Sequence, residues 1–595
     1  MNIMSILALR DAYQSGGLDW TSHIRQLVND IRVQYTAGDP AWLNVLSQEA
    51  LENRIHALKM YQGNLPLLGI PFAVKDNIDV AGWTTTAACP AFSYTASQTA
   101  PVVQALLDAG AILIGKTNLD QFATGLVGTR SPFGIVPNPL NHEYICGGSS
   151  SGSASVVARQ YVAFSLGTDT AGSGRIPAGF NHLVGYKPTP GKFSTQGVVP
   201  ACRTLDCVSI FTHTVKDAAL LVNLLEQSPG QKNDPDFYAH EPLHFAYAKK
   251  PKVAVPINCE FLPDSTYPTA FENSLAHARN MGWEIEFVDF SPFYAVAQLL
   301  YEGPWVAERY IATQGLLEKS PESMNPIVRT IIERAKGMSA AQSFESLYEL
   351  KNLAQSCQAL WGNYDVMLVP TAPGHPKIEA VNANPIELNN QLGRYTNFVN
   401  LLGLAAIAVP DQRLENGLPF GITLIGRNNH DWALLELAQR WQCARNSTLA
   451  ESGDLEWPAS GYTKLAVVGA HLTGMPLHTQ LVERGARLLA QTETSKNYQL
   501  FALANTMPPK PGLVRVSSAG SAIALEVYAI PTVHLGSFLD LIPTPLGLGN
   551  VELADGSWVK SFICEPYALE HAANISHYGG WRAYTEHLKS NSNRQ

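Results

Sequence analysis

The sequence has few charged residues and no long basic run. Charged side chains make up 15% of its 595 residues, and the formal net charge is −9 at pH 7. Nowhere do five or more lysines and arginines follow one another. Proteins that bind nucleic acid neutralise its phosphates with clustered lysine and arginine. We therefore expect no nucleic-acid partner.

Long hydrophobic runs and paired cysteines are missing as well. No apolar run approaches the roughly 18–20 residues that a membrane-spanning helix needs. Arg10 and Asp11 interrupt the short apolar stretch at the N-terminus, which argues against a secretory signal. The eight cysteines are scattered, with no CxxC pair, which is typical of a reducing compartment and not of a disulfide framework. These absences predict a soluble, cytoplasmic protein without a membrane partner.

Hydrophobic residues make up 46% of the chain, and their spacing predicts an α/β domain over residues 1–446. Residues 1–62 carry apolar positions at helical spacing, including the segment WLNVLSQEALENRIHAL. From residue 66, short apolar runs alternate with helical segments, which is typical of a largely parallel or mixed sheet flanked by helices. A mainly helical stretch, about 292–361, indicates an insertion. The predicted strands are LPLLGIPFAV, AILIG, YVAFSLG, KVAVP, EIEFVDF, DVMLVPT, AIAVP and GITLIG.

A second, small α+β domain is predicted over residues 465–595. The preceding residues, 447–464, are polar and contain Gly and Pro, which indicates a linker. The region beyond it is rich in strand-like runs, among them KLAVVGAHL, YQLFALANT, LVRV and AIALEVYAI. Asp555-Gly556 lies between two alternating strands and predicts a hairpin, because both positions of a two-residue turn favour positive φ.

Two motif matches are rejected because of their surroundings. Residues 110–117, GAILIGKT, fit the phosphate-binding pattern GxxxxGK[ST], but AILI has the composition of a buried strand and not of a flexible loop. Residues 148–152, GSSSG, fit the GxSxG pattern of α/β-hydrolases. The preceding HEYICG is a poor candidate for the buried strand that this pattern requires. We therefore predict neither a nucleotide site nor an α/β-hydrolase.

Two serines in glycine-rich loops, Ser149 in CGGSSSGS and Ser173 in DTAGSG, are candidates for nucleophilic chemistry. A serine hydroxyl is a weak nucleophile until a base removes its proton. His142 and His182 are the histidines near these loops, and both lie in polar segments where a surface position explains them better. The base must therefore be sought elsewhere.

Lys75, at the end of GIPFAVK, can act as that base if its amine is neutral. Burial disfavours the charged form and lowers the pKa of a lysine from its ordinary value of about 10.4. The alternative is a lysine at the edge of the core that pairs with Asp76 or Asp79. The segment alone favours neither interpretation.

The small residues Thr170, Ala171 and Gly172 precede Ser173. They would allow several backbone N–H groups to point into one concavity, where such groups stabilise the oxyanion of a tetrahedral intermediate. The alternative is a tight turn between a strand and a helix in which the glycines are structural.

In order and spacing, PFAVKDN, GGSSSGS and DTAGSGRIP resemble the motifs of the amidase signature family, and the resemblance covers about residues 20–445. It implies a central mixed sheet flanked by helices and amide hydrolysis by a Ser–Ser–Lys triad, with no metal or organic cofactor. Ser173 would be the nucleophile, Ser149 the proton relay within a cis peptide, and Lys75 the base.

The same resemblance implies supporting roles around the triad. The N–H groups of Thr170 through Ser173 would form the oxyanion hole. Ser150, Asp169 and Arg175 would hold the two loops in place. The sequence departs from the usual GGSSGG run at Ser151, which replaces a glycine and leaves the triad intact.

Two further segments, DQFATGLVGTRSPFG (120–134) and LYEGPWVAERY (300–310), resemble the allophanate hydrolase branch of this family. The resemblance implies that Tyr301 and Arg309 hold the urea and carboxylate ends of allophanate, and that Gly125 adds a backbone contact. A guanidinium matches a planar carboxylate, and Pro304 suits the first turn of the helix that would carry it. The alternative is a solvated pair of Arg309 with Glu308.

The C-terminal domain resembles the extra domain of allophanate hydrolases, which has a γ-glutamylcyclotransferase-like fold. The resemblance implies that this domain helps to process the first product, N-carboxycarbamate, to carbon dioxide and ammonia. The matching polar residues are His471 and Glu526. For each of them the alternative is a structural role.

As a whole, the resemblance implies an allophanate hydrolase that forms a homodimer and has urea carboxylase as a functional partner. Within the same class the alternatives are a broad-specificity amidase and the glutaminase subunit of a tRNA amidotransferase, and the extra domain counts against both. From another class, the alternative is a non-catalytic scaffold protein. The intact Lys75, Ser149 and Ser173 argue against it.

Overall fold

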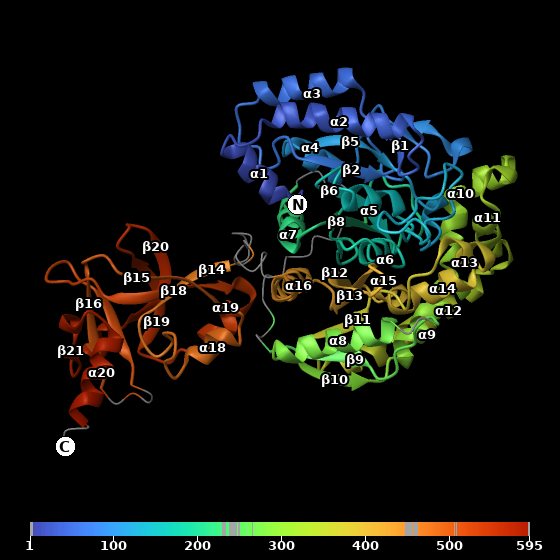
Figure 1. Ribbon diagram of the computed structural model, residues 1–595. Helices are drawn as coiled ribbons and strands as arrows, with labels where there is room; N and C mark the ends of the chain where they lie inside the picture. The colour runs from blue at the N-terminus through green and yellow to red at the C-terminus, as the bar shows by residue number, and fades with distance from the viewer. Residues whose placement is uncertain are drawn as a thin grey trace. The chain divides into compact units, whose positions relative to one another are not determined.

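The computed structural model describes residues 4–228, 234–236, 247, 250–263, 266–446, 455, 462–504, 506 and 509–592. The chain forms two compact units, the first from residues 1–241 and 249–456 and the second from residues 242–248 and 457–595. Figure 1 traces both along the chain. Of the predicted linker, 447–464, only residues 455 and 462–464 are among those described.

Among the described residues, a mixed sheet of eleven strands forms the centre of the first unit (Figure 1). In sheet order these strands are β1 (Trp42–Val45), β5 (Ile112–Thr117), β2 (Pro71–Lys75), β6 (Phe164–Asp169), β8 (Cys207–Thr212), β7 (Val184–Lys187), β12 (Ala405–Arg413), β13 (Pro419–Gly426), β11 (Val366–Pro370), β9 (Lys252–Pro256) and β10 (Glu284–Val288). β2 pairs in parallel with β5 and β6, and β9 pairs in parallel with β10 and β11. The other neighbours are antiparallel. The predicted mixed sheet is confirmed.

Each of the eight predicted apolar runs contributes a strand to this sheet, and residues 112–117 form the buried β5 as expected. Two central strands, β7 and β8, were not predicted. β8 pairs with both β6 and β7, and its first residue, Cys207, lies opposite Asp169 at the end of β6. This pairing brings the residues before β8 next to the second glycine loop.

The N-terminal region forms α1 (Ile6–Gln14), α2 (Trp20–Thr36) and α3 (Gln48–Met60). Each helix begins after a residue whose side chain accepts a backbone N–H of the first turn, namely Ser5, Asp19 and Ser47. The helical prediction is wrong for residues 42–45, which form β1. This segment pairs with the outer edge of β5, and the hydrogen bonds to that otherwise unpaired edge outweigh the helical spacing of its apolar residues.

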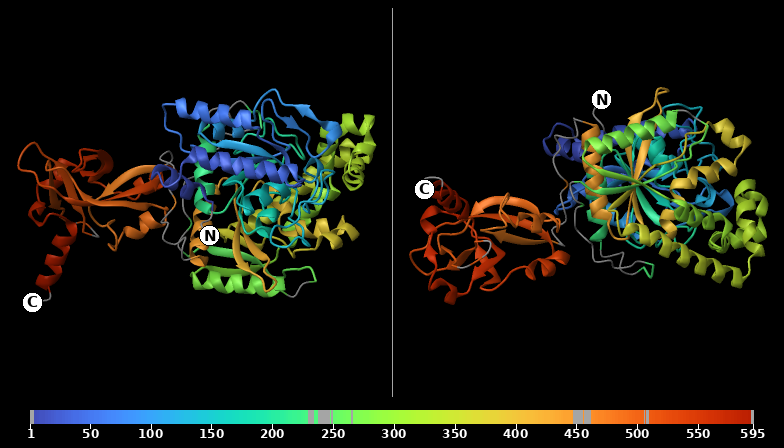
Figure 2. Two further views of the ribbon diagram at one scale, coloured as in Figure 1. Left: turned by 45° about the horizontal axis from the view of Figure 1, so that its top comes forward. Right: turned by 90° about the horizontal axis from the view of Figure 1, so that it is seen from below.

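Helices surround the sheet, as Figure 2 shows. They are α4 (Pro101–Asp108), α5 (Ser151–Ala158), α6 (Ile176–Phe180), α7 (Val215–Glu226), α8 (Thr266–Asn280), α13 (Ile378–Ala383), α14 (Glu387–Leu392), α15 (Asn397–Leu401) and α16 (Asp431–Arg445). The predicted helical stretch, about 292–361, contains α9 (Ser291–Glu302), α10 (Val306–Lys319), α11 (Pro326–Glu333) and α12 (Ala340–Trp361). None of the described helices is long and apolar enough to cross a membrane.

The second unit contains a five-stranded and a three-stranded sheet. The first has the order β15 (Arg487–Glu493), β18 (Ala524–Pro531), β14 (Tyr462–Val467), β20 (Trp558–Cys564) and β19 (Leu546–Glu552), and the second has the order β17 (Pro511–Arg515), β16 (Tyr498–Ala502) and β21 (Ala573–Asn574). Among the described residues of this unit the α-helices are α18 (His478–Val482), α19 (Thr532–Leu539) and α20 (Trp581–Ser592). Buried apolar side chains of these elements form a core of the unit's own. The predicted small C-terminal α+β domain is confirmed.

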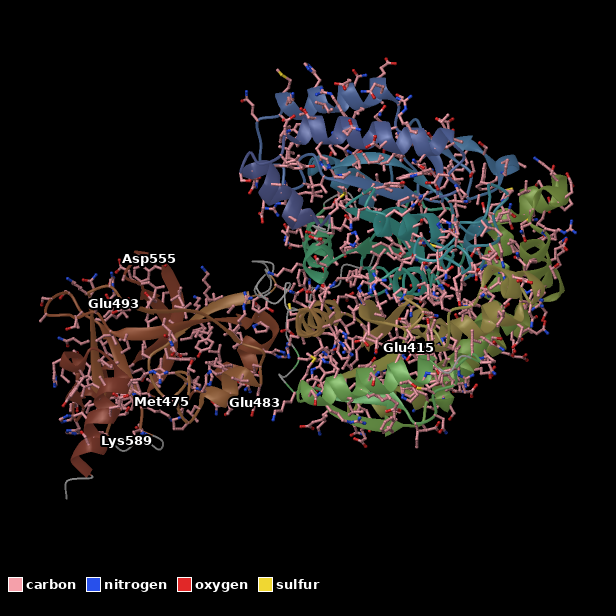
Figure 3. All side chains as sticks on the ribbon, in the orientation of Figure 1. Glu415, Met475, Glu483, Glu493, Asp555 and Lys589 are labelled. Atoms are coloured by element: carbon pink, nitrogen blue, oxygen red, sulfur yellow. The ribbon has the colours of Figure 1, made fainter. Side chains whose placement is uncertain are left out.

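The predicted hairpin joins β19 and β20, and Asp555 lies at its tip (Figure 3). Its turn differs from the prediction. Leu553 N–H donates to the carbonyl of Ser557 at 2.8 Å, so three residues close the loop and not two. Among the described loop residues only Gly556 has a positive φ, +82°, which a three-residue loop requires at one position alone.

Candidate active site

Lys75 is the last residue of β2, and its side chain is completely buried. Its amine donates hydrogen bonds to Ser149 Oγ at 2.7 Å and to Thr168 Oγ1 at 2.8 Å. Val74 lies opposite Leu166 on the parallel strand β6, so the ends of both strands meet where the amine lies. The arrangement places a lysine amine and a serine hydroxyl in direct contact inside the protein.

The alternative pairing of Lys75 with the neighbouring carboxylates is wrong. Asp76 forms an ion pair with Lys116 at 3.0 Å. Asp79 accepts hydrogen bonds from the hydroxyls of Thr85 and Tyr94. Adjacent residues of an extended segment point to opposite faces, which directs Asp76 away from the Lys75 amine, and Asp79 is engaged by its own donors.

Burial lowers the pKa of Lys75 to about 7, although the negative charges of Asp120, Asp206 and Asp169 act in the opposite direction. A buried amine loses the water that stabilises its charged form. In the described part of the chain, no ion pair joins Lys75 to any of these carboxylates. At neutral pH a large fraction of the amine is therefore free to accept a proton.

The loop that carries Ser149 is tightly packed around Asp120. The Gly148–Ser149 peptide is cis, and the Ser149 carbonyl accepts the Asp120 N–H at 3.0 Å. A Cβ atom at Gly148 would lie 2.1 Å from Asp120 Oδ2, so only glycine fits there. Asp120 in turn accepts the N–H groups of Val127, Gly128 and Arg130 at 2.9–3.2 Å. This buried carboxylate, which was not predicted, fixes the first loop.

Asp169 at the end of β6 holds the second loop. Its carboxylate accepts the N–H groups of Gly172 at 2.8 Å and Gly174 at 3.0 Å. It also forms a fully buried ion pair with Arg175, with an Nε–Oδ2 distance of 2.9 Å. Ser150 donates to the carbonyl of Thr168 at 3.2 Å. All three predicted supporting residues thus contact the segment that leads to Ser173.

Ser173 is 3% exposed, and its hydroxyl donates to the carbonyl of Gly125 at 3.4 Å. Within the described part of the chain, the N–H groups of Ala171 and Ser173 have no acceptor. The Gly172 N–H is already donated to Asp169, so in this arrangement it does not point at a substrate. Gly172 has φ +127°, and a Cβ there would lie 2.4 Å from Thr396 Oγ1.

Arg309 lies in the first turn of α10 and is 2% exposed. The alternative, a solvated pair with Glu308, is wrong, because Glu308 accepts the N–H of Thr204 at 2.9 Å together with its hydroxyl. The positive charge of Arg309 acts against the rise that burial causes in the pKa of Asp206. Thr204, two residues before Asp206, bonds Glu308, the residue before Arg309, so the start of α10 lies beside the segment that carries Asp206. Tyr301 belongs to α9, and its side chain lies outside the described residues.

Asp206, directly before β8, is a buried polar residue of the site that was not predicted. Its carboxylate accepts the Thr170 hydroxyl and the N–H groups of Ala201 and Cys202. Burial raises its pKa to about 6. A charged residue directly before the buried run CVSIFT could have been noticed in the sequence. The hydrogen bonds of Asp206 could not have been predicted, because their donors lie in two separate segments of the chain.

In the second unit, His471 lines a cavity of about 50 Å³ together with Lys510 and Phe562. Its Nε2 shares a hydrogen bond with Gln480 Oε1 at 2.9 Å. Burial lowers the pKa of His471. A neutral imidazole next to a lysine in a small, mostly apolar cavity can accept a proton or donate a hydrogen bond to a small anion.

Glu526 lies at a different cavity, of about 560 Å³, lined by Tyr578, Trp581 and Arg582 among others. Its carboxylate pairs with Arg582 at 3.0 Å and accepts the hydroxyls of Thr473 and Tyr528. Burial alone would raise its pKa, but these contacts lower it. The two predicted C-terminal residues thus line different cavities, although Glu526 bonds Thr473, two residues after His471. In neither unit do three described His, Cys, Asp or Glu side chains converge to hold a metal ion.

Two family models match the chain. The model described as Amidase covers residues 33–435, and the model described as Allophanate hydrolase C-terminal domain covers residues 463–586. Urea amidolyase of Saccharomyces cerevisiae is 46% identical over 94% of this chain, and the chain spans 32% of its length. A glutamyl-tRNA(Gln) amidotransferase subunit of Treponema denticola is 32% identical, with 63% of this chain and 84% of that protein covered.

Among solved structures, the allophanate hydrolase of Kluyveromyces lactis superimposes with a TM-score of 0.86 at 42% identity. The match covers 96% of this chain and 98% of that one. The chain thus spans about a third of the curated urea amidolyases that it matches, but almost the whole of this solved enzyme. Since the Amidase model covers more than half of the chain, this protein belongs to the amidase family and is an amidohydrolase.

Proposed function

We propose that the chain hydrolyses allophanate, urea-1-carboxylate, at its terminal amide and releases ammonia. The contact between Ser149 and the buried, weakly basic amine of Lys75 carries this proposal. The similarity to an allophanate hydrolase along almost the full length of both chains supports the choice of substrate.

In the proposed mechanism, the neutral amine of Lys75 accepts the proton of Ser149 while Ser149 accepts the proton of Ser173. The Ser173 oxygen attacks the terminal carbonyl, and the relay returns a proton to the amide nitrogen, which leaves as ammonia. Water then attacks the acyl-enzyme by the same relay and frees N-carboxycarbamate and the Ser173 hydroxyl. Each step moves protons among residues of this chain and water.

The oxyanion of each tetrahedral intermediate is stabilised by backbone donors. The N–H groups of Ala171 and Ser173, which have no acceptor among the described residues, support this role. The N–H of Gly172 is a weaker candidate because Asp169 accepts it. Arg309 would bind the carboxylate of the substrate, because it is a buried arginine that follows Glu308, and Glu308 bonds the segment whose Asp206 contacts Thr170. Tyr301 and Gly125 would complete the substrate site.

The second unit would convert N-carboxycarbamate to carbon dioxide and ammonia, with His471 as its reactive group. The match to the allophanate hydrolase C-terminal domain supports this proposal. Urea carboxylase would supply the substrate, and the enzyme would act as a homodimer. Glu526, which is saturated by hydrogen bonds, would have a structural role.

Ammonia release from allophanate tests the triad. Ser173→Ala and Lys75→Met should each lower kcat/KM by at least about a thousandfold. Lys187→Met is the matched control, because Lys187 is a fully buried lysine of the same sheet whose pKa burial also lowers. It should keep the wild-type rate if folded. Wild-type ammonia release by either triad variant would refute the mechanism.

A further inference from the structure

Residues 201–206, which we call the linking turn, connect two parts of the site that belong to different segments. The turn ends at Asp206, which is 6% exposed. Asp206 Oδ2 accepts the N–H of Ala201 at 2.8 Å and that of Cys202 at 3.2 Å, and Oδ1 accepts the Thr170 hydroxyl. One carboxylate thus closes the turn on itself and fastens it to the glycine loop of Ser173.

A second contact ties the linking turn to the same loop. The side-chain amide of Asn400 donates to the carbonyl of Leu205 at 3.0 Å and to the carbonyl of Asp169 at 2.8 Å. Asp169 is the residue that holds Gly172 and Gly174 in position. Asp169 and Thr170 are therefore both connected to the linking turn, Asp169 through Asn400 and Thr170 through Asp206.

The other side of the linking turn contacts helix α10. Thr204 donates its N–H and hydroxyl to Glu308, and the Cys202 thiol donates to the carbonyl of Trp305 at 3.3 Å. Arg309, one residue after Glu308, is the charge that favours the ionised form of Asp206. The first turn of α10 is thus fixed by the same six residues that hold the glycine loop.

We propose that Asp206 is a positioning residue that sets the distance between the oxyanion donors and Arg309. This inference rests on the proposed function. In allophanate a single nitrogen separates the attacked carbonyl group from the carboxylate group. The enzyme can therefore bind both groups at once only if the oxyanion donors and Arg309 are held at a fixed distance from each other. Displacement of a positioned group by about 1 Å lowers a rate by about a hundredfold.

A carboxylate suits this role better than an amide of the same size. Ionised Asp206 accepts donors at both oxygens, whereas an asparagine offers one oxygen and one NH₂ group that repels an N–H donor. In Asp206→Asn the side-chain oxygen can keep the N–H groups of the turn, but the NH₂ group then faces Thr170, whose hydroxyl must accept instead of donate. The charge-assisted contact with the glycine loop is thereby replaced by a weaker neutral one.

The test compares allophanate with biuret, in which an amide replaces the carboxylate. Asp206→Asn should lower kcat/KM about tenfold on biuret, which needs only the oxyanion donors, and about tenfold more on allophanate. In enzyme that also carries Arg309→Met, Asp206→Asn should lower kcat/KM by the same factor on both substrates, because Arg309 is then absent and the carboxylate of allophanate is no longer bound. A loss of stability alone would lower both rates equally, so the ratio of the two rates reports positioning.

Asp217→Asn is the matched control. Asp217 is also fully buried, and burial raises its pKa to about 6 as well, but it accepts the N–H of Leu7 on the N-terminal helix. It should leave the ratio of the two rates unchanged. If Asp206→Asn does not fold, Glu308→Ala replaces it, because the hydrogen bonds of this partly exposed residue within the described part of the chain all go to Thr204. It should lower the allophanate rate several-fold more than the biuret rate.

An unchanged ratio in both Asp206→Asn and Glu308→Ala would overturn the positioning role. It would leave the proposed function standing if the wild-type enzyme hydrolyses allophanate. A wild-type enzyme that hydrolyses biuret and not allophanate would instead overturn the proposed function.

Discussion

At the scale of single residues, the proposed chemistry centres on the amine of Lys75. Its pKa of about 7 means that about half of the molecules carry a neutral amine at pH 7, compared with about one in three thousand for a solvated lysine. Removal of water does most of this, since the nearby carboxylates act in the opposite direction. A base of this strength matches the pH at which it works.

The pH dependence of kcat/KM for allophanate follows from this pKa. Protonated Lys75 cannot accept the proton of Ser149, so activity should fall as pH drops below about 7, with a midpoint near that value. Steady-state kinetics between pH 5.5 and 8.5 measure the profile. A flat profile across this range would show that the amine is not the base.

Lys75→Met should make the folded protein more stable at pH 7. The folded-state pKa, about 7, lies below the ordinary value of 10.5, so the unfolded chain binds more protons between these values and the free energy of unfolding rises from pH 7 to pH 10. At pH 7 the neutral amine costs the fold about 5 kcal/mol, and two lost hydrogen bonds offset about 2 kcal/mol of the gain. The melting temperatures of the wild type and Lys75→Met should differ clearly at pH 7 and little at pH 10. A less stable variant at pH 7 would contradict this account.

Arg309→Met should separate substrate binding from chemistry. It removes the charge and keeps most of the volume, so kcat/KM should fall about a hundredfold or more on allophanate and little on biuret. Arg203→Met is the control, because Arg203 is an exposed arginine of the linking turn that pairs with Asp236. Equal losses on both substrates would exclude a carboxylate-binding role.

The motifs of the sequence led to Lys75, Ser149 and Ser173 and to one carboxylate that holds them, Asp169, but not to Asp120 and Asp206. The two glycine loops are local features with a composition that can be read along the chain. Asp120 and Asp206 act by accepting donors from segments that fold back onto them. Such a role depends on tertiary contacts, which no local pattern contains.

At the scale of elements, the parallel pairing of β2 with β6 brings the site together. Because both strands run in the same direction, Lys75 at the end of one and Asp169 at the end of the other reach the same edge of the sheet. The eight predicted runs are strongly apolar and could be recognised. β7 is only four residues long and contains a glycine, and β8 contains a serine at its centre, so neither has the continuous apolar character on which the prediction depended.

Gly148→Ala tests how rigidly the first loop is held. The added Cβ would lie 2.1 Å from Asp120 Oδ2 and 2.5 Å from the nitrogen of Gly128, and neither atom can move without breaking the hydrogen bonds of Asp120. The variant should lose nearly all activity and melt at a lower temperature. Gly315→Ala in α10 is the control, because its Cβ would meet no atom within 4 Å. It should keep activity and gain about 0.5–1 kcal/mol of stability. Activity in Gly148→Ala would show that the loop can adapt.

At the scale of the whole molecule, the chain combines two units with separate cores, and the length of 595 residues already indicated more than one domain. The strand-rich runs after residue 465 predicted the second unit because their alternation is local. The length of the hairpin loop was predicted wrongly, because a single Gly at a positive φ fits a three-residue loop as well as a two-residue one.

The two units should contribute separate ammonia molecules. Full-length enzyme should release two ammonia molecules per allophanate, and His471→Ala should release the first at the wild-type rate and the second more slowly. His571→Ala, a variant at an exposed histidine of the same unit, should behave as wild type. A time course of ammonia and carbon dioxide distinguishes the two steps. Simultaneous loss of both ammonia molecules in His471→Ala would contradict the division of labour.

The linking turn reaches the protein surface at Thr204, while its other end touches the interior at Asp206. Substitutions at Thr204, on the surface, can therefore change the distance between the oxyanion donors and Arg309, and with it the length of the acyl group that the enzyme prefers. The proposed proton relay of Lys75 and Ser149 forms no hydrogen bond with Thr204 or Glu308 in the described part of the chain and would stay intact. Directed evolution toward new amides has a natural starting point at Thr204 and Glu308.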